Sequence, residues 1–230
     1  MAAPDSHPGI SNLGEAHDPG VPLFGPKYRE RLVLSQPWAR RTLSGLAAVM
    51  LLAAVGVLGY PFYTNLYQDR VQGSLDGQLA SPELEQAYRA DNVAEGDSRT
   101  RLMIPSLDVD VVVVEGTSPR ALRAGAGHYP ESPLPCQLGN MAIAGHRTTY
   151  GRPFHNLDLL KPGDKIILET PVGTCTYSVN KDPFVVQPND FSVLDRTATG
   201  TLTLTTCHPK NSAAQRLIVQ ADLEGPAASA

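Results

Sequence analysis

One long apolar segment near the start of the chain limits what the rest of it can be. No charged residue occurs from Thr42 to Tyr63, and about 20 apolar residues are enough for a helix to cross the hydrocarbon core of a bilayer. Arg40 and Arg41 directly precede the segment, and an excess of positive charge marks the cytoplasmic side of a membrane helix. The sequence therefore predicts a single transmembrane helix over residues 42–63, with the N-terminus in the cytoplasm and the bulk of the chain outside.

A buried core helix or a cleaved signal peptide would also be apolar over such a length. The apolar run is, however, longer than the hydrophobic part of a typical signal peptide. It also ends at Gly59-Tyr60-Pro61, which lacks the small-residue pattern of a signal-peptidase site. Length and flanking charges together favour a membrane anchor.

Composition divides the 230-residue chain into further parts. The first residues are rich in Pro, Gly, Asp and Ser, a composition typical of disorder. The net charge is −4 and no basic patch stands out, so no nucleic-acid partner is expected. We predict a cytoplasmic disordered tail (1–41), the transmembrane helix (42–63), an extracytoplasmic stalk (64–98), a β-barrel domain (99–223) and a C-terminal tail (224–230).

Short apolar runs separated by turn residues fill the predicted domain. Val109–Glu115, for example, is rich in β-branched valine and is followed by Gly116, as expected of a strand that ends in a turn. Several hairpins are implied, and strands do not alternate with long helices. The sequence therefore predicts a mainly β fold, an antiparallel or mixed β-barrel with short connecting helices. Strands are expected over 101–104, 109–115, 140–146, 165–170, 174–186, 201–207 and 216–222.

Two short helices have start signals in the sequence. Ser118 precedes Pro119 at the start of 118–124, the combination of a capping side chain with a residue suited to the first helical turn. Ser81 and Pro82 repeat this pattern inside the polar segment 64–98, although a stalk is the favoured interpretation there.

A cysteine ends one of the predicted strands. Thr201–Thr206 alternates threonine with leucine, as suits a pleated surface, and Pro209 has no N–H with which to continue the ladder. Cys207 therefore lies where a rigid strand meets a loop, and Arg216 returns beside it if the next strand forms a hairpin. A cysteine in such a place is either a small buried side chain or a mounted nucleophile.

Two further polar residues sit at strand ends and favour the second interpretation. His146 closes a predicted central strand, and Arg216 opens the strand after Cys207. A thiol becomes a good nucleophile beside an imidazole or a cation, and a guanidinium is suited to stabilise the oxyanion of acyl transfer. Each residue alone has an ordinary structural role, but together they indicate cysteine-dependent acyl transfer.

These motifs resemble those of sortases, the membrane-anchored transpeptidases of Gram-positive bacteria. Thr203–Cys207 reads T-L-T-T-C, similar to the T-L-x-T-C strand of the family, and Arg216 fits its strand-opening arginine. Ala144–His146 fits the strand-ending histidine. Gly145–Phe154 and Cys207–Pro209 are most similar to the class E sortases of actinobacteria. No lid motif of the class C type precedes the predicted barrel.

The resemblance implies a closed, eight-stranded β-barrel and a cysteine transpeptidase. Cys207 would attack the carbonyl between Thr and Gly of a C-terminal sorting signal and release the glycine side. His146 would protonate the leaving amine and later deprotonate the incoming one, while Arg216 would hold the substrate and the oxyanion. The acyl group would pass to an amine of lipid II or peptidoglycan, which anchors a surface protein to the cell wall. No cofactor is expected.

Two residues are implied as substrate contacts by the same resemblance. Thr206 precedes the nucleophile in the matched motif and is expected to help form its pocket. Tyr150 lies just after the histidine, and the likeness to class E implies that it helps to select L-A-x-T-G over L-P-x-T-G signals. Peptides with either signal are candidate substrates.

The three cysteines of the chain belong to a domain expected outside the cell. If Cys207 must stay reduced, Cys136 and Cys175 are available to pair, and a disulfide between them is a hypothesis beside that of two free thiols. No metal site is expected, because His146, Cys207 and His208 lack the spacing of zinc ligands.

Two alternative functions stay open. An L,D-transpeptidase would resemble S-H-G-C around its nucleophile, whereas this chain has Thr205-Thr206-Cys207-His208. A non-catalytic, membrane-anchored β-barrel that binds ligands of the cell envelope would keep the core pattern but need no reactive thiol. Labelling of Cys207 in the native protein distinguishes this binding module from an enzyme.

Overall fold

The structure is a computed structural model of the chain, and it describes residues 36–225. The rest of the two predicted tails, residues 1–35 and 226–230, lies outside the described residues. The chain divides into two compact units, Met1–Val55 and Gly56–Ala230.

Helix α2 (Pro37–Leu79) contains the whole apolar segment. A window of this helix has a mean hydropathy of 2.1, and none of the window is buried. By length and composition the helix is able to cross a membrane, as the sequence predicted. The helix continues well past the predicted boundary at Tyr63, since residues 64–79 contain no proline to interrupt it.

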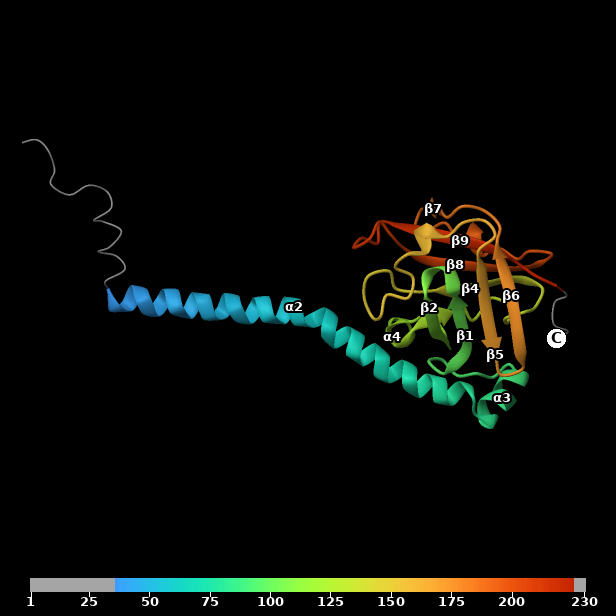
Figure 1. Cartoon of the computed structure of the whole chain (residues 1–230), viewed down its shortest axis with the longest axis horizontal. Helices are drawn as coiled ribbons and strands as arrows, with labels where there is room; N and C mark the ends of the chain where they lie inside the picture. The colour runs from blue at the N-terminus through green and yellow to red at the C-terminus, as the bar shows by residue number, and fades with distance from the viewer. Residues whose placement is uncertain (1–35, 226–230) are drawn as a thin grey trace, which may run out of the picture. The chain divides into compact units, whose positions relative to one another are not determined.

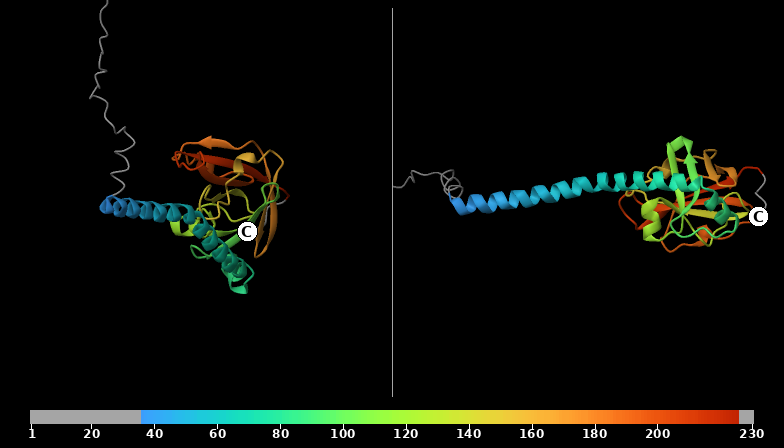
Figure 2. Two further views of the ribbon diagram at one scale, coloured as in Figure 1. Left: turned by 60° about the vertical axis from the view of Figure 1, so that its left-hand side comes forward. Right: turned by 90° about the horizontal axis from the view of Figure 1, so that it is seen from below.

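The strands of residues 36–225 form one sheet, and eight of the nine close into a barrel, which can be followed in Figure 1 and from two further sides in Figure 2. They are β1 (Ser98–Ile104), β2 (Val109–Glu115), β3 (Ala126–His128), β4 (Gly139–Ala144), β5 (Lys165–Thr170), β6 (Gly173–Val179), β7 (Phe184–Val186), β8 (Gly200–His208) and β9 (Gln215–Leu223). The order around the barrel is β6-β5-β1-β2-β3-β4-β8-β9, and β6 pairs with β9 to close it. The predicted fold class, a closed eight-stranded barrel, is confirmed, and β7 is an additional strand on β9.

Two parallel pairs make this barrel mixed. β2 runs parallel to β3 and β4 runs parallel to β8, whereas β3 and β4 are antiparallel to each other, as are β8 and β9. The end of β4, the end of β8 and the start of β9 therefore lie at one end of the barrel. We call this end the cysteine rim.

The barrel core fixes the loop that follows β4. Leucines such as Leu102 on β1 and Leu204 on β8 are fully buried in it. Phe154, which lies in the loop, is buried in the same cluster. Its ring packs on Gly145, where an added Cβ would be 2.5 Å from the ring atom Cδ2. Any side chain at position 145 would displace Phe154, so this glycine is needed for the loop to enter the core.

Residues 64–98 form a docked helical segment and not the predicted stalk. The Gln72 side chain of α2 donates from Nε2 to the Val112 carbonyl at 3.2 Å and accepts at Oε1 from the Val112 N–H at 2.7 Å. Val112 precedes the first residue of β2 that pairs with β3, so Gln72 replaces a missing strand partner. Farther along α2, Gln78 Oε1 accepts from the N–H of Ser98 at 3.0 Å. The sequence did not predict this docking, because a glutamine on a polar helix face is usually exposed to solvent.

Both predicted helix starts are confirmed. Helix α3 (Pro82–Arg89) is capped by Ser81, whose Oγ accepts from the N–H of Leu84 at 3.2 Å. Helix α4 (Pro119–Ala124) is capped in the same way by Ser118. In each case the cap satisfies an N–H that has no partner within its helix.

Several strand limits differ from those predicted. β3 lies where no strand was predicted, because three residues are too few to show a pattern. β4 ends at Ala144, so His146 follows the strand and does not close it. The predicted strand 174–186 is two strands, β6 and β7, and β8 includes His208.

Cys136 and Cys175 form a disulfide, with their Cα atoms 5.6 Å apart. The bond joins the loop before β4 to β6, and it bears out the hypothesis of a pair. Cys207 is a free thiol.

Candidate active site

The register of the barrel brings the predicted functional residues to the cysteine rim. Cys207 lies opposite Arg216 in the antiparallel pair β8–β9. His146 follows β4, and the neighbouring Gly145 donates its N–H to the carbonyl of Thr205 at 3.1 Å. The thiol, the guanidinium and the imidazole thus come from adjacent backbone segments, although they are far apart in sequence.

Thr206 ties the histidine loop to the cysteine strand. It is buried, and its Oγ1 donates to the carbonyl of Gly145 at 2.8 Å. A hydroxyl has one proton to donate, so Thr206 can only accept from any further partner. The bond holds the residue before His146 against the strand that ends in the half-buried Cys207.

His146 is half-buried and has an aromatic neighbour. The ring centroid of Tyr150 lies 5.3 Å from that of His146, at an interplanar angle of 38°. Burial lowers the pKa of His146, and the positive charge of Arg123 lowers it further. Both causes disfavour the charged imidazolium, so the structure favours an uncharged ring that is able to accept a proton.

Arg216 keeps part of its donor set free. Its Nη1 donates to the carbonyls of Ala213 and Gln215, each at 3.0 Å. These contacts use the two N–H groups of Nη1 and leave the donors on Nε and Nη2. Within the described part of the chain Arg216 has no carboxylate partner, so its charge is available to an anionic group at the cysteine rim.

Arg147 is a buried residue of the site that sequence reasoning missed. Its side chain is 3% exposed and pairs through Nη2 with Asp158 at 3.0 Å. Nη1 donates to the carbonyl of Cys207 at 3.2 Å and to Nδ1 of His208 at 2.9 Å. Because arginine only donates, Nδ1 is the unprotonated nitrogen of His208. The sequence offered one signal, an arginine directly after His146, but nothing in it shows that this side chain turns inward.

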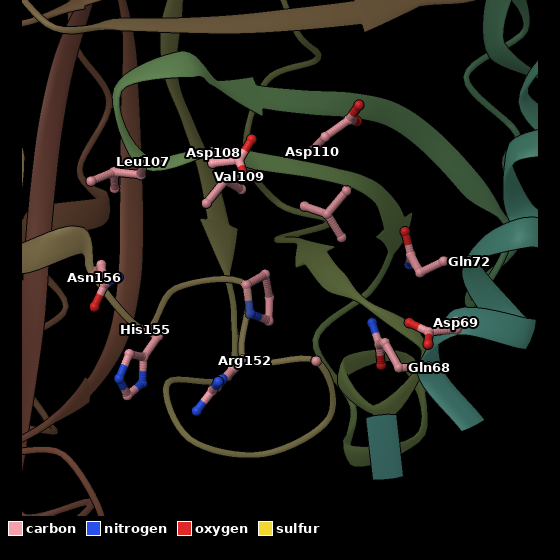
Figure 3. Close-up of a pocket in the computed structure, with 13 residues that line it drawn as sticks. Gln68, Asp69, Gln72, Leu107, Asp108, Val109, Asp110, Arg152, His155 and Asn156 are labelled. Atoms are coloured by element: carbon pink, nitrogen blue, oxygen red, sulfur yellow. The ribbon is translucent and has the colours of Figure 1, made fainter. Parts of the chain in front are cut away.

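A polar groove of about 480 Å³ opens beside this rim (Figure 3). Figure 3 shows Gln68 and Asp69 of α2 on one side of it, and Arg152 and His155 of the loop after β4 on the other. The side chains of the predicted catalytic residues do not line it. In residues 36–225 no three His, Cys, Asp or Glu side chains are grouped to hold a metal ion. The groove therefore borders the candidate active site without containing the thiol.

Comparison with known proteins shows to which family the barrel belongs. A model of the sortase domain matches residues 102–224, which include His146, Cys207 and Arg216. The chain belongs to the sortase family. Among curated relatives, this sortase is 31% identical to sortase SrtE1 of Streptomyces coelicolor, in an alignment that covers 87% of the chain and 63% of the relative. It is 30% identical to SrtE2 of the same organism, in an alignment that covers 53% of the chain and 54% of the relative. The predicted likeness to class E is confirmed, and the chain spans less than two thirds of the length of these relatives.

Solved sortase structures share the barrel. The crystal structure of Streptomyces coelicolor sortase E1 with a tripeptide in its active site has a TM-score of 0.51 and 33% identity, covering 56% of this chain and 90% of that one. The sortase D5 transpeptidase of Clostridium perfringens has a TM-score of 0.60 and 29% identity, covering 69% of this chain and 98% of that one. Both structures are therefore similar to this chain in sequence as well as in fold.

Proposed function

We propose that this sortase is a cysteine transpeptidase that joins surface proteins to the cell wall. The observation that carries the proposal is the register that sets Cys207 opposite Arg216 at the rim where His146 follows β4. A thiol, a fixed cation and a weak base are the groups that acyl transfer needs. The match to the sortase domain and the likeness to a sortase D5 transpeptidase support the assignment.

The first half of the reaction forms a thioester. The Cys207 thiol gives its proton to His146, its sulfur attacks the carbonyl carbon of the Thr–Gly bond in a sorting signal, and a tetrahedral oxyanion forms. The C–N bond then breaks as His146 gives a proton to the leaving glycine nitrogen. The threonine acyl group stays on sulfur, and the glycine fragment departs.

The second half transfers the acyl group to an amine. An amine of lipid II or of peptidoglycan attacks the thioester carbonyl, and uncharged His146 takes its proton. The C–S bond breaks, and the sulfur takes the proton from His146 and becomes a thiol again. A new amide then joins the surface protein to the cell-wall precursor. The lowered pKa of His146 fits this role as proton acceptor.

Arg216 and Thr206 support the two steps from opposite sides of the nucleophile. The Nε and Nη2 donors of Arg216, which its loop leaves free, hold the oxyanion and the substrate backbone. Thr206 fixes Gly145, and so the start of the histidine loop, while its oxygen can still accept from a substrate N–H.

Tyr150 takes part in selecting the sorting signal. Its ring lies beside His146, where a substrate bound to Cys207 passes in the proposed reaction. Replacing Tyr150 with Ala is expected to change the ratio of kcat/KM for L-A-x-T-G and L-P-x-T-G peptides. An unchanged ratio, measured by product mass, would contradict the role.

The protein is proposed to be a single-pass membrane protein with its barrel outside the cell. Helix α2 supplies the span over residues 42–63, and the arginines before it place the N-terminus inside. The catalytic domain then comprises residues 99–223. A protease added to intact cells is expected to remove the barrel and leave the N-terminal tail protected.

An intact-mass experiment tests the function. The full chain in detergent is mixed with a peptide containing L-A-x-T-G, and the mass is expected to rise by a peptide truncated after threonine. The Cys207→Ala variant is expected to gain nothing. Absence of an adduct with both L-A-x-T-G and L-P-x-T-G peptides, from folded and reduced protein, would favour the binding-module alternative.

A further inference from the structure

An arginine outside the predicted catalytic set lies in contact with the histidine's aromatic neighbour. Arg123 is in the last turn of α4, and its Cζ is 5.9 Å from the ring centroid of Tyr150. This distance is within the range of a cation–π contact. The Tyr150 ring in turn packs against His146, 5.3 Å away. Guanidinium, phenol and imidazole therefore form a continuous series that ends at the proposed proton carrier.

The docked part of α2 contacts the two chain segments that carry Arg123 and Tyr150. The carbonyl of Ala124, next to Arg123, accepts from Nε2 of Gln68 at 3.0 Å and from Nε2 of Gln72 at 2.8 Å. Gly151, next to Tyr150, has a φ of +67°, and a Cβ there would be 2.7 Å from Cγ of Gln68. α2 thus packs against the segments that carry Arg123 and Tyr150, which fixes their separation.

The charge of Arg123 acts on the histidine as well as on the ring between them. Tyr150 from the same loop packs against His146, and the charge of Arg123 on α4 acts on it. The neighbouring Arg147 is neutralised by Asp158. Burial and the charge of Arg123 are the two causes that lower the pKa of His146. Arg123 is therefore the cation whose charge disfavours the protonated, positively charged form of the imidazole.

We propose that Arg123 is a positioning residue of the transfer reaction, which orders the Tyr150 ring against His146 and supplies a fixed positive charge beside the imidazole. The inference rests on the proposed function of His146. In the second half of that reaction the ring must be uncharged to take a proton from the incoming amine. Arg123 favours that form without touching the substrate.

Three variants of the full chain in detergent test the proposal. Arg123→Gln removes the charge, and Arg123→Lys keeps it on a different head group. Arg120→Gln removes an exposed charge from the same helix and serves as the matched control. The His146 pKa is read from the pH dependence of its ring signals in protein labelled with ¹⁵N-histidine, and the signals are assigned from the spectrum of His146→Gln.

The His146 pKa is expected to rise in Arg123→Gln and to stay near its wild-type value in Arg123→Lys and Arg120→Gln. The kcat/KM for transfer is expected to fall about two- to fivefold in Arg123→Gln, the size of an exposed cation–π contact, with partial rescue by lysine. An unchanged His146 pKa in folded Arg123→Gln would overturn the proposal, as would an equal pKa rise in Arg120→Gln. If the wild type transfers no peptide, the proposed function fails, while the titration still decides whether Arg123 and His146 are coupled.

Discussion

The docking of α2 on the barrel makes a quantitative prediction for Gln72→Leu. The glutamine makes three hydrogen bonds to the main chain, two to Val112 and one to the carbonyl of Ala124. Val112 is only 3% exposed, so water cannot easily replace the lost partner. Leaving a buried polar group unsatisfied costs about 1–3 kcal/mol, and Gln68 still donates to Ala124. With two groups left unpaired, and some gain from the apolar leucine, the loss in the free energy of unfolding is about 2–4 kcal/mol.

Urea unfolding of a soluble fragment that starts at Thr64, followed by circular dichroism, measures this loss. Gln86→Leu is the matched control, because Gln86 is exposed on α3, and a change within about 0.5 kcal/mol is expected there. Hydrogen exchange of the Val112 amide should accelerate in Gln72→Leu alone. A loss below about 0.5 kcal/mol, with the Val112 amide still protected, would show that Gln72 does not complete the edge of β2 and would refute the reasoning.

Three further predictions concern the stability and chemistry of the barrel. The disulfide Cys136–Cys175 closes a loop with a sequence separation of 39, and replacing both cysteines with alanine should lower the free energy of unfolding by about 2–4 kcal/mol. Arg147→Met should cost about 1–3 kcal/mol, since it leaves the carbonyl of Cys207 without its donor while water replaces the arginine at the partly exposed Asp158, and kcat should fall with it. Burial raises the pKa of Tyr88 to about 12, so the unfolded chain loses this proton first, near pH 10, and stability should decline between about pH 10 and 12.

Each of these has an outcome that would contradict it. Dithiothreitol should destabilise the wild type but leave the double alanine variant unchanged, and equal sensitivity would argue against the bond. An Arg147→Met variant with wild-type kcat would separate that residue from the active site. Tyr88→Phe should remove part of the alkaline decline, and identical profiles for wild type and variant between about pH 9 and 11 would reject the assignment to Tyr88.

Local patterns were sufficient for the features that depend on neighbours in sequence. The serine caps at Ser81 and Ser118, the strand that ends in Cys207 and the apolar run of α2 were all recognisable. Each reflects hydrogen bonds or hydrophobic periodicity within a few residues. The two caps and the end of the cysteine strand agree with the structure to within one residue, whereas α2 continues to Leu79, well past the predicted end of the apolar run.

Features that depend on long-range packing could not be read in this way. Gln72 lies forty residues from Val112, and the sequence around a glutamine in a polar helix does not indicate its hydrogen-bond partner. β3 is too short for a periodic signal and exists because its neighbours β2 and β4 provide pairing on both sides. Arg147 would ordinarily be exposed, and its burial depends on partners that include the carbonyl of Cys207, His208 and Asp158.

Composition and short-range spacing were enough to establish one apolar span, a mainly β domain and the three residue types of cysteine acyl transfer. The folded barrel added which strands are neighbours, and so set Cys207 opposite Arg216 and Arg123 over the ring beside His146. It also showed that residues 64–79 belong to the barrel's surface. The physical reason is that pairing across a closed sheet and the pairing of buried polar groups are satisfied by partners distant in the chain, and only folding brings those partners together.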